Sequence, residues 1–388
     1  MLHRRMARRP KRERILSKNG PHRTPEHSSV DSPPAATSGD TLPALLELTR
    51  PDDWHLHLRD GAMLARVLPH TARVFGRAIV MPNLDPPVVT TSEAERYAER
   101  IRALLPGDST FEPLMTLYLT DAMSPAEVER AAASSQVAAV KLYPKGATTH
   151  SARGVARLDA LAPVLEALER HDLPLLVHGE STDVETDVFD RERRFLEDSL
   201  APLVARHAGL RVVFEHITTA DAVAFVEEAP ARVGATITPQ HLLMNRNAIF
   251  EGGLRPHHYC LPVLKREEDR VALVRAATSG DASFFLGTDS APHERFAKEA
   301  ACGCAGIFSA PIAIEAYAEA FAQAGALDRL EGFASHHGAD FYRLPRNRDR
   351  IRLERVDWVA PDREGAGDES VEIFWAGRPF LYRMGSTD

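Results

Sequence analysis

The stretch Leu173-Pro174-Leu175-Leu176-Val177-His178 is an apolar run that ends in one histidine. A short run without alternating polar residues is typical of a strand buried on both faces of a parallel sheet. The histidine then stands where the carboxyl end of that strand would be. The same order, an apolar run followed by a polar side chain, recurs along the chain, and this recurrence predicts the fold.

Eight runs of this kind alternate with longer segments that have helical spacing. The runs centre on Trp54–Leu58, Ala78–Met81, Leu114–Leu119, Val137–Leu142, Leu173–Val177, Val212–Phe214, Val233–Ile237 and Phe284–Leu286. Alternation of strands and helices indicates βα units and a parallel sheet. Eight such units are the number that closes a (β/α)8 barrel, so the predicted fold class is α/β, a TIM-type barrel.

Three of the intervening segments carry specific helix signals. Ser92 followed by Glu95 resembles a capping box ahead of a periodic run. Ser124 is a predicted N-cap with Pro125 at the first helical position. Residues 158–170 repeat apolar residues at helical spacing. These segments are predicted to be barrel helices.

The composition is that of an ordinary globular protein. The 388 residues are 44% hydrophobic and 26% charged. The three cysteines, Cys260, Cys302 and Cys304, are too few for a disulfide framework and indicate a reducing compartment. No stretch approaches the roughly 18 apolar residues of a membrane span, and the N-terminus lacks the apolar run of a secretory signal. We therefore expect a cytoplasmic protein with no membrane partner.

Charge is distributed unevenly along the chain. Residues 1–40 hold nine Lys or Arg against four Asp or Glu, whereas the whole chain carries −8, so residues 41–388 carry −13. An acidic body argues against a nucleic-acid partner, because phosphate contacts need clustered cations. Residues 1–40 are rich in Arg, Ser and Pro and predict a disordered basic extension. Contact with RNA or an anionic membrane, a transit-like leader and a mis-assigned start are alternatives for it.

Polar residues follow nearly every predicted strand, at or near its carboxyl end. They are His57, Asn83, Thr120, Lys141, His178, His216 and Asp289, with His241 a little beyond the seventh strand. Barrel enzymes place their active sites at this rim. The candidate site is therefore predicted to lie there, within a single barrel domain of residues 41–388.

Several of these residues are typical metal ligands. His55 and His57 alternate on the first strand, so they share a face about 6.6 Å apart along the chain, and two imidazoles can converge on one zinc ion. Two surface histidines are the alternative. His178 and His216 could each be a core histidine, but their equivalent places after successive strands favour a shared site.

Asp289 and Lys141 are the charged groups of this set. A carboxylate that ends a buried run, as Asp289 does, is costly unless a metal or proton stabilises it. Lys141 is predicted to be desolvated, and it could pair with a carboxylate or extend to water. A third possibility is that burial lowers its pKa and frees the amine. The free amine could then capture carbon dioxide as an anionic carbamate that bridges two metal ions.

Six segments together resemble the amidohydrolase superfamily and, within it, the class II dihydroorotases. These segments are residues 53–60, 81–84, 141–144, 176–180, 214–218 and 287–293. The resemblance runs from about Thr41 to the C-terminus. It implies a reversible, zinc-dependent cyclisation of N-carbamoyl-L-aspartate to (S)-dihydroorotate in pyrimidine biosynthesis, by an enzyme that is commonly a homodimer.

The resemblance also implies roles for individual residues. Two zinc ions would be bridged by Lys141, as N6-carboxylysine, and by a hydroxide. One ion would be bound by His55, His57, Lys141 and Asp289, and the other by Lys141, His178 and His216. Asp289 would also be the catalytic base and acid.

On the same resemblance, Arg59, Asn83 and His293 would bind the substrate carboxylate, and the backbones of Leu261 and Ala305 would contact the substrate. Thr148 and Thr149 would belong to a mobile lid. For Arg59, the alternative to carboxylate binding is an ion pair with Asp60. For Thr148 and Thr149, the alternative to a lid is an ordinary solvated loop.

Cys302-Gly303-Cys304 lacks the spacing of a cysteine zinc site. Gly303 and Gly306 are instead predicted to shape a loop that lets backbone approach a ligand.

Two other functions compete with this interpretation. A hydantoinase or allantoinase would share the metal ligands but not the carboxylate-binding residues Arg59, Asn83 and His293. A catalytically inactive barrel that serves as a scaffold would have lost ligands, and none is lost here.

Overall fold

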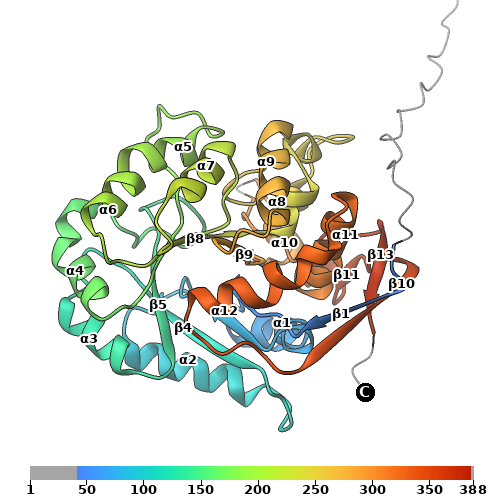
Figure 1. The fold of residues 1–388 in the computed structure, drawn as a ribbon, viewed down its shortest axis with the longest axis horizontal. Coiled ribbons are helices and arrows are strands. Elements are labelled where there is room, and N and C mark those ends of the chain that lie inside the picture. Colours follow the sequence, from blue (N-terminus) through green and yellow to red (C-terminus); the bar gives the residue numbers. More distant parts are fainter. Residues whose placement is uncertain (1–41, 302, 386–388) are drawn as a thin grey trace, which may run out of the picture. The chain divides into compact units, whose positions relative to one another are not determined.

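Eight parallel strands occupy the centre of the computed structural model, which describes residues 42–301 and 303–385 (Figure 1). They pair in the order in which they occur in the chain: β2 (Asp53–Leu56), β3 (Arg77–Val80), β4 (Glu112–Tyr118), β5 (Val137–Leu142), β6 (Leu175–Val177), β7 (Val212–Phe214), β8 (Val233–Ile237) and β9 (Phe284–Leu286). Each predicted run overlaps one of these strands, so the predicted α/β barrel is confirmed. The predicted extension, residues 1–40, lies outside the described residues.

The first and last strands meet at their carboxyl ends. Leu56 forms a parallel bridge with Ser290. The His57 amide donates to the Ser290 carbonyl at 2.9 Å, and the Asp289 amide donates to the His55 carbonyl at 2.8 Å. The barrel therefore closes through the residues that were predicted to carry the chemistry.

Asp53 reinforces this closure. Its buried carboxylate accepts from the Thr288 amide at 2.9 Å, the Thr288 hydroxyl at 2.6 Å and the His55 amide at 3.1 Å. Burial raises the pKa of Asp53 to about 7, although these hydrogen bonds oppose the shift. One side chain thus connects the two strands on which the candidate metal ligands stand.

Replacing Asp53 with alanine is expected to lower the free energy of unfolding by about 3 kcal/mol, because buried donors on Thr288 and His55 would lose their acceptor. Asp53→Asn keeps an acceptor oxygen and should cost less than half as much. Urea unfolding followed by circular dichroism measures both values. Equal losses in the two variants would contradict this account.

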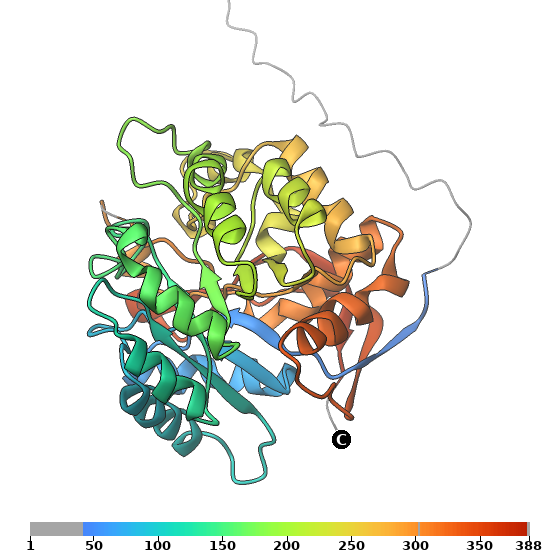
Figure 2. The same ribbon diagram turned by 60° about the vertical axis from the view of Figure 1, so that its left-hand side comes forward.

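Helices cover the outside of the barrel (Figures 1 and 2). They are α1 (Gly61–Val74), α2 (Thr91–Ala103), α3 (Pro125–Ala133), α4 (Ala162–Arg170), α5 (Arg191–Phe195), α6 (Ala201–Arg206), α7 (Ala220–Glu228), α8 (Pro239–Leu243), α9 (Glu267–Thr278), α10 (Arg295–Lys298), α11 (Ala313–Gln323) and α12 (His337–Phe341). Among the described residues, no helix combines the length and apolar character needed to cross a membrane.

Two of the three predicted helix signals are confirmed. Ser124 caps α3 by accepting from the Glu127 amide, with Pro125 in the first turn. The segment 158–170 is helical, although its first turn, Leu158–Leu161, is a 3-10 helix.

The capping box predicted at Ser92 and Glu95 is wrong. The structure forms it two residues earlier, between Thr90 and Glu93. Both pairs fit the same spacing, so the motif alone could not choose between them. A tertiary contact stabilises the earlier start of α2, because the amide and hydroxyl of Thr91 both donate to the buried Glu127 of α3.

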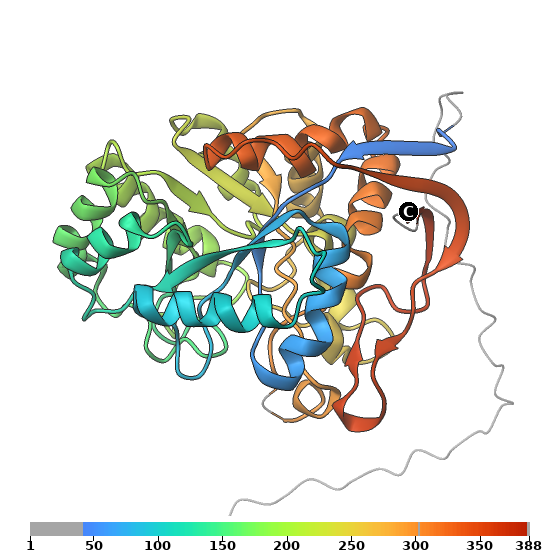
Figure 3. The ribbon, with the colours of Figure 1, turned by 90° about the horizontal axis from the view of Figure 1, so that it is seen from below.

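A second, antiparallel sheet lies beside the barrel and was not predicted. β10 (Arg350–Val359) pairs with β1 (Leu45–Thr49) on one side and with β13 (Pro379–Met384) on the other. Figure 3 shows β1 against this late part of the chain. A smaller pair joins β11 (Arg363–Glu364) and β12 (Val371–Glu372). Residues 41–388 therefore contain more than the barrel.

The interior of the barrel beneath the site is filled by apolar side chains. The layer contains Trp54, Ile79, Leu114, Leu176, Val213 and Phe285. Trp54 stacks on Tyr342 with ring centres 4.6 Å apart. A methyl group at Gly338 would meet the Trp54 ring at 2.0 Å, so this end is tightly packed. The polar site above it therefore faces only the carboxyl ends of the strands.

Candidate active site and metal centre

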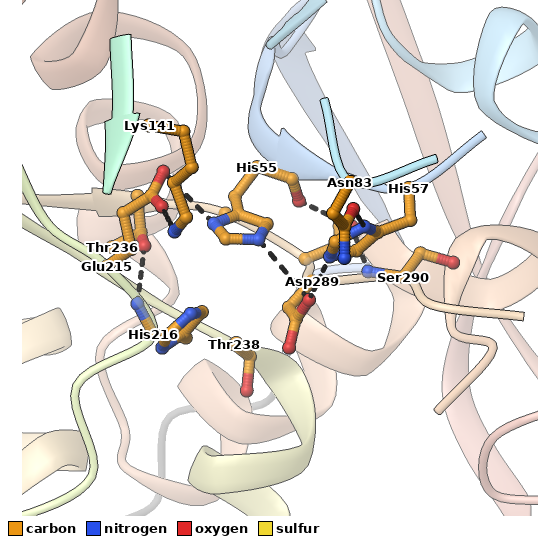
Figure 4. A network of polar contacts seen from close by, with 12 residues as sticks. His55, His57, Asn83, Lys141, Glu215, His216, Thr236, Thr238, Asp289 and Ser290 are labelled. Atoms are coloured by element: carbon orange, nitrogen blue, oxygen red, sulfur yellow. Dashed lines mark hydrogen bonds and ion pairs between the residues drawn. The ribbon is translucent and has the colours of Figure 1, made fainter. Parts of the chain in front are cut away.

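Histidine, lysine and aspartate side chains from five strands converge at the carboxyl end of the barrel, and Figure 4 labels those that belong to β2, β5, β7 and β9. They come from β2, β5, β6, β7 and β9, either within the strand or within three residues after it. All six predicted metal ligands are buried: His55, His57, Lys141, His178, His216 and Asp289. The fold therefore brings together side chains that are up to 234 positions apart in the sequence.

The first predicted ligand group forms around Asp289. Its Oδ1 lies 3.3 Å from His55 Nε2 and 3.1 Å from His57 Nε2. On the far side of the His57 ring, Nδ1 lies 2.8 Å from Asn83 Oδ1 and donates to it. This contact directs Nε2 inward, as second partners of metal-binding histidines do.

The second group is built around His216. Its ring centre lies 4.8 Å from that of His178 and 4.9 Å from that of His55. His178 Nε2 pairs with Glu180 Oε2 at 2.9 Å, so the Nδ1 of that ring is the atom left to bind a metal ion. His216 Nδ1 is buried, and no group of the described chain forms a hydrogen bond with it.

Two sets of donor atoms are close enough to share an ion. They are His55, His57 and Asp289, and His55, Glu215 and His216, with the atoms of each set within 4.8 Å of one another. Neutral imidazole and carboxylate are zinc ligands. The unpaired His216 Nδ1 and the close donor atoms fit a metal centre at this position.

Burial makes these histidines suitable ligands. It lowers the pKa of His57 to about 3 and also lowers the pKa of His55, His178 and His216. The neutral rings keep the lone pairs that a metal ion requires. Burial acts to raise the pKa of Asp289, whereas the contacts with His55 and His57 lower it, and the result lies well below the usual value of an aspartate.

Lys141 is fully buried in β5, as predicted. Burial lowers its pKa well below the ordinary 10.5 of a lysine. Its Nζ contacts Glu215 Oε2, and Glu215 Oε1 lies 3.0 Å from His55 Nδ1. The pairing of the lysine with a carboxylate, one of the alternatives from the sequence, is therefore the contact in this structure.

Glu215 is the functional residue that sequence reasoning missed. Its side chain is fully buried and contacts both Lys141 and His55. The available signal was a carboxylate directly before His216, at the end of a strand without other charges.

Three residues of the site adopt a left-handed backbone. The φ angles are 60° for Arg59, 42° for His216 and 45° for Asp289. Non-glycine residues rarely adopt this conformation, and where they do they cluster at functional sites. Here each such residue follows a barrel strand within three positions, and all three line the cavity described below.

A small cavity opens between the ligands and the loops above them. Arg59, Asn83, Thr148, Thr149, Leu261 and Ala305 line it together with the metal-ligand candidates. Its volume of about 20 Å3 is room for about one water molecule. Four of the five predicted substrate residues and both lid threonines thus border one space with the candidate metal ligands, and His293 is the substrate residue that does not line it.

Arg59 extends toward His293 rather than to solvent. Its Nε donates to the Pro292 carbonyl at 3.1 Å, and its Nη2 lies 3.0 Å from His293 Nε2. Asp60 pairs instead with Arg100 at 2.8 Å. The alternative of a surface ion pair between Arg59 and Asp60 is therefore wrong.

His293 Nε2 has two competing neighbours. Arg59 Nη2 can only donate to it, whereas the Ala305 carbonyl, 3.1 Å away, can only accept. One ring nitrogen cannot satisfy both at once. A ligand that accepts from Arg59 would resolve the conflict.

The loop with Thr148 and Thr149 lies against the cavity. The Thr148 amide donates to Ser151 Oγ at 2.8 Å, and Asn83 Nδ2 lies 3.5 Å from the Thr149 carbonyl. Both threonines are half-buried, whereas the neighbouring His150 is exposed. The loop is therefore packed onto the site.

Two other rim residues, His241 and Thr120, do not line the cavity. His241 is buried, with Nδ1 at 2.7 Å from the Thr238 hydroxyl and Nε2 at 3.1 Å from the Pro262 carbonyl, so both ring nitrogens have partners. Thr120 follows β4 but does not line the cavity.

Two glycines shape the loop beside Ala305, as predicted, and the approach of its backbone to a ligand stays a prediction. Gly303 and Gly306 have φ angles of 46° and 151°, and a Cβ on Gly306 would lie 2.4 Å from the Ala291 carbonyl. Cys302 lies outside the described residues.

Comparison with known proteins identifies the family. Residues 42–352 match the Amidohydrolase family. The chain is 62% identical to the dihydroorotase of Alkalilimnicola ehrlichii over 339 residues, which cover 87% of this chain and 99% of that protein. The chain belongs to the dihydroorotase family. The resemblance to dihydroorotases inferred from the sequence is thereby confirmed.

Solved structures agree with this membership. The dihydroorotase of Saccharomyces cerevisiae, crystallised with 5-fluoroorotic acid, superposes with a TM-score of 0.82 at 32% identity, covering 88% of this chain and 98% of that chain. The L-hydantoinase of Arthrobacter aurescens has a TM-score of 0.72 at 15% identity, covering 87% and 82%. That second likeness shows a shared fold only. The dihydroorotase interpretation is therefore favoured over a hydantoinase.

Proposed function

We propose that this chain catalyses the reversible, zinc-dependent conversion of N-carbamoyl-L-aspartate and (S)-dihydroorotate in pyrimidine biosynthesis. One observation carries the proposal: the cluster of predicted metal ligands and the cationic Arg59 border the same buried cavity. A site of this kind can activate water and hold an anionic substrate at once. Membership of the dihydroorotase family supports the choice of substrate.

Two zinc ions are proposed as cofactors. His55, His57 and Asp289 would hold one, His178 and His216 the other, and Lys141 would join both as a carbamate. The uncharged Lys141 amine would form a bond to the carbon of carbon dioxide and lose one proton, giving an anionic N6-carboxylysine. When bound, zinc lowers the pKa of water from about 15.7 to about 7 and polarises a carbonyl.

Asp289 is proposed as the catalytic base and acid. Its ionised carboxylate is oriented by His55 and His57. During ring opening it would accept a proton from the attacking water and pass it to the ring nitrogen as the C–N bond breaks. During ring closure the same carboxylate would take the proton from the ureido nitrogen.

The substrate carboxylate is proposed to bind beside this cluster. Arg59 can donate two parallel hydrogen bonds to a carboxylate, and Asn83 retains its Nδ2 donor because Oδ1 is engaged by His57. A carboxylate that accepts from Arg59 would leave His293 Nε2 free to donate to the Ala305 carbonyl. The backbones of Leu261 and Ala305 would contact the substrate.

Replacing Arg59 with glutamine should reduce kcat/KM for dihydroorotate roughly 10- to 100-fold, mainly through KM, because a charge-assisted hydrogen bond is worth about 1.5–3 kcal/mol. Steady-state ring-opening assays measure this. Arg100→Gln, which removes an exposed arginine paired with Asp60, is the control and should behave as wild type. A loss confined to kcat would speak against carboxylate binding by Arg59.

Thr148 and Thr149 are proposed to belong to a lid. The cavity of about 20 Å3 leaves little room for a six-membered ring, and movement of this loop would open the site to substrate. The contacts of Thr148 with Ser151 hold the loop in the packed position.

We further propose a cytoplasmic homodimer whose only partners in catalysis are small molecules. The scarcity of cysteines supports a reducing compartment, and sedimentation equilibrium tests the dimer. The decisive test of function is turnover of dihydroorotate compared with hydantoin by the zinc-loaded protein. Turnover of hydantoin with none of dihydroorotate would overturn the proposal. Fewer than one zinc per chain after purification would favour a scaffold.

A further inference from the structure

Lys298 is a buried cation outside the catalytic cluster. It is the last residue of α10, and only 3% of its surface is exposed. Its Nζ donates to three backbone carbonyls: Tyr259 at 2.7 Å, Cys304 at 2.8 Å and Gly306 at 2.7 Å. These three contacts use every N–H of an ammonium group. Within residues 42–301 and 303–385 no carboxylate pairs with it.

The three carbonyls belong to the two loops that form one wall of the cavity. The first loop contains Tyr259 and, two residues later, Leu261, which lines the cavity. The second loop contains Ala305, which lines the cavity between Cys304 and Gly306. The Gly306 amide also donates to the Tyr259 carbonyl at 3.0 Å. Lys298 therefore fixes the backbone on both sides of Ala305 and two residues before Leu261.

Lys298 also places positive charge near the site. Burying an ammonium without a carboxylate is costly, and carbonyl dipoles offset the cost without cancelling the charge. The positive charges of Arg59 and Lys298 both help to lower the pKa of His293 after burial, which places Lys298 within electrostatic reach of the proposed carboxylate position. Burial lowers the pKa of Lys298 itself to about 8.

We propose that Lys298 is a positioning residue that holds the Leu261 and Ala305 backbones in contact with substrate and favours ligands with a carboxylate over neutral ring amides. This inference rests on the proposed dihydroorotase function. It predicts an effect on substrate binding rather than on the metal centre, since Lys298 contacts none of the proposed zinc ligands among the described residues.

The test compares Lys298→Met with wild type in the zinc-loaded enzyme. Methionine preserves the length of the side chain but removes the charge and all three donors. We expect KM for dihydroorotate to rise at least 10-fold, kcat to stay within 3-fold and zinc content to stay unchanged. Inhibition by dihydrouracil, the same ring without its carboxylate, should weaken less than 3-fold. Lys145→Met, at an exposed lysine, is the matched control.

An unchanged KM for dihydroorotate, or equal weakening of both ligands, would overturn the proposal. If Lys298→Met does not fold, Lys298→Gln is used in its place, because glutamine retains two N–H donors without the charge. The ratio of its affinities for dihydroorotate and dihydrouracil, compared with that of wild type, then decides. Wild-type activity separates the two levels of inference. An inactive wild type refutes the proposed function, whereas an active wild type with an unaffected Lys298 variant refutes only the role of Lys298.

Discussion

Asp289→Ala is expected to lower kcat/KM for dihydroorotate by about 10³-fold, with at least one zinc ion retained per chain. General acid–base catalysis by one side chain contributes about 10²- to 10⁴-fold. Asp289 is the carboxylate that His55 and His57 both contact, so its removal takes away the proton carrier. The four histidines and Lys141 remain to bind metal. Ring-opening assays and elemental analysis on the same sample measure both quantities.

Asp328→Ala is the matched control for this experiment, since Asp328 is exposed and lies outside the cavity. It should retain wild-type rate and zinc content. An Asp289 variant within 10-fold of wild type, with its zinc intact, would assign the proton transfer to another group.

Lys141→Ala is expected to have the second large effect, on metal content itself. Zinc should fall below one ion per chain, and ring opening should fall below detection. The physical reason is that the proposed carbamate is the only protein ligand common to both ions, so each ion loses a donor when the lysine is absent. Lys145→Ala, four residues on and exposed, is the control. Zinc analysis and thermal unfolding with and without added zinc measure the outcome.

The state of Lys141 can be tested directly. Intact-mass analysis of the active enzyme under mild conditions should show the added mass of carbon dioxide, and Lys141→Ala should lack it. Active enzyme with an unmodified lysine would instead favour the contact with Glu215 as the working state, because that contact already satisfies a buried amine. Full zinc content in Lys141→Ala would exclude the bridging role.

The barrel was predictable from local sequence. Runs such as 173–177 and 212–214 are apolar on both faces, and only a parallel sheet covered by helices buries both faces of a strand. Since parallel strands present their carboxyl ends at one rim, the polar residues after them had to meet. The convergence of His55, His178 and Asp289 follows from this pattern without knowledge of any distance.

The second sheet could not be predicted in this way. β1 has five residues, of which only Leu48 is buried, and its partner β10 lies some 300 positions later in the chain. No local pattern specifies such a pairing. The start of α2 failed for the same reason, since the choice between two equal capping motifs was made by a glutamate of α3.

By itself, the sequence determined the fold class, the rim on which the chemistry stands and the residue types gathered there, because burial patterns and strand polarity are local properties. Only the tertiary structure decided which atoms face each other. Glu215 contacts Lys141 and His55, Arg59 turns to His293 instead of Asp60, and Lys298 joins two loops. These choices depend on distances between separate strands and loops, and such distances exist only once the barrel has closed.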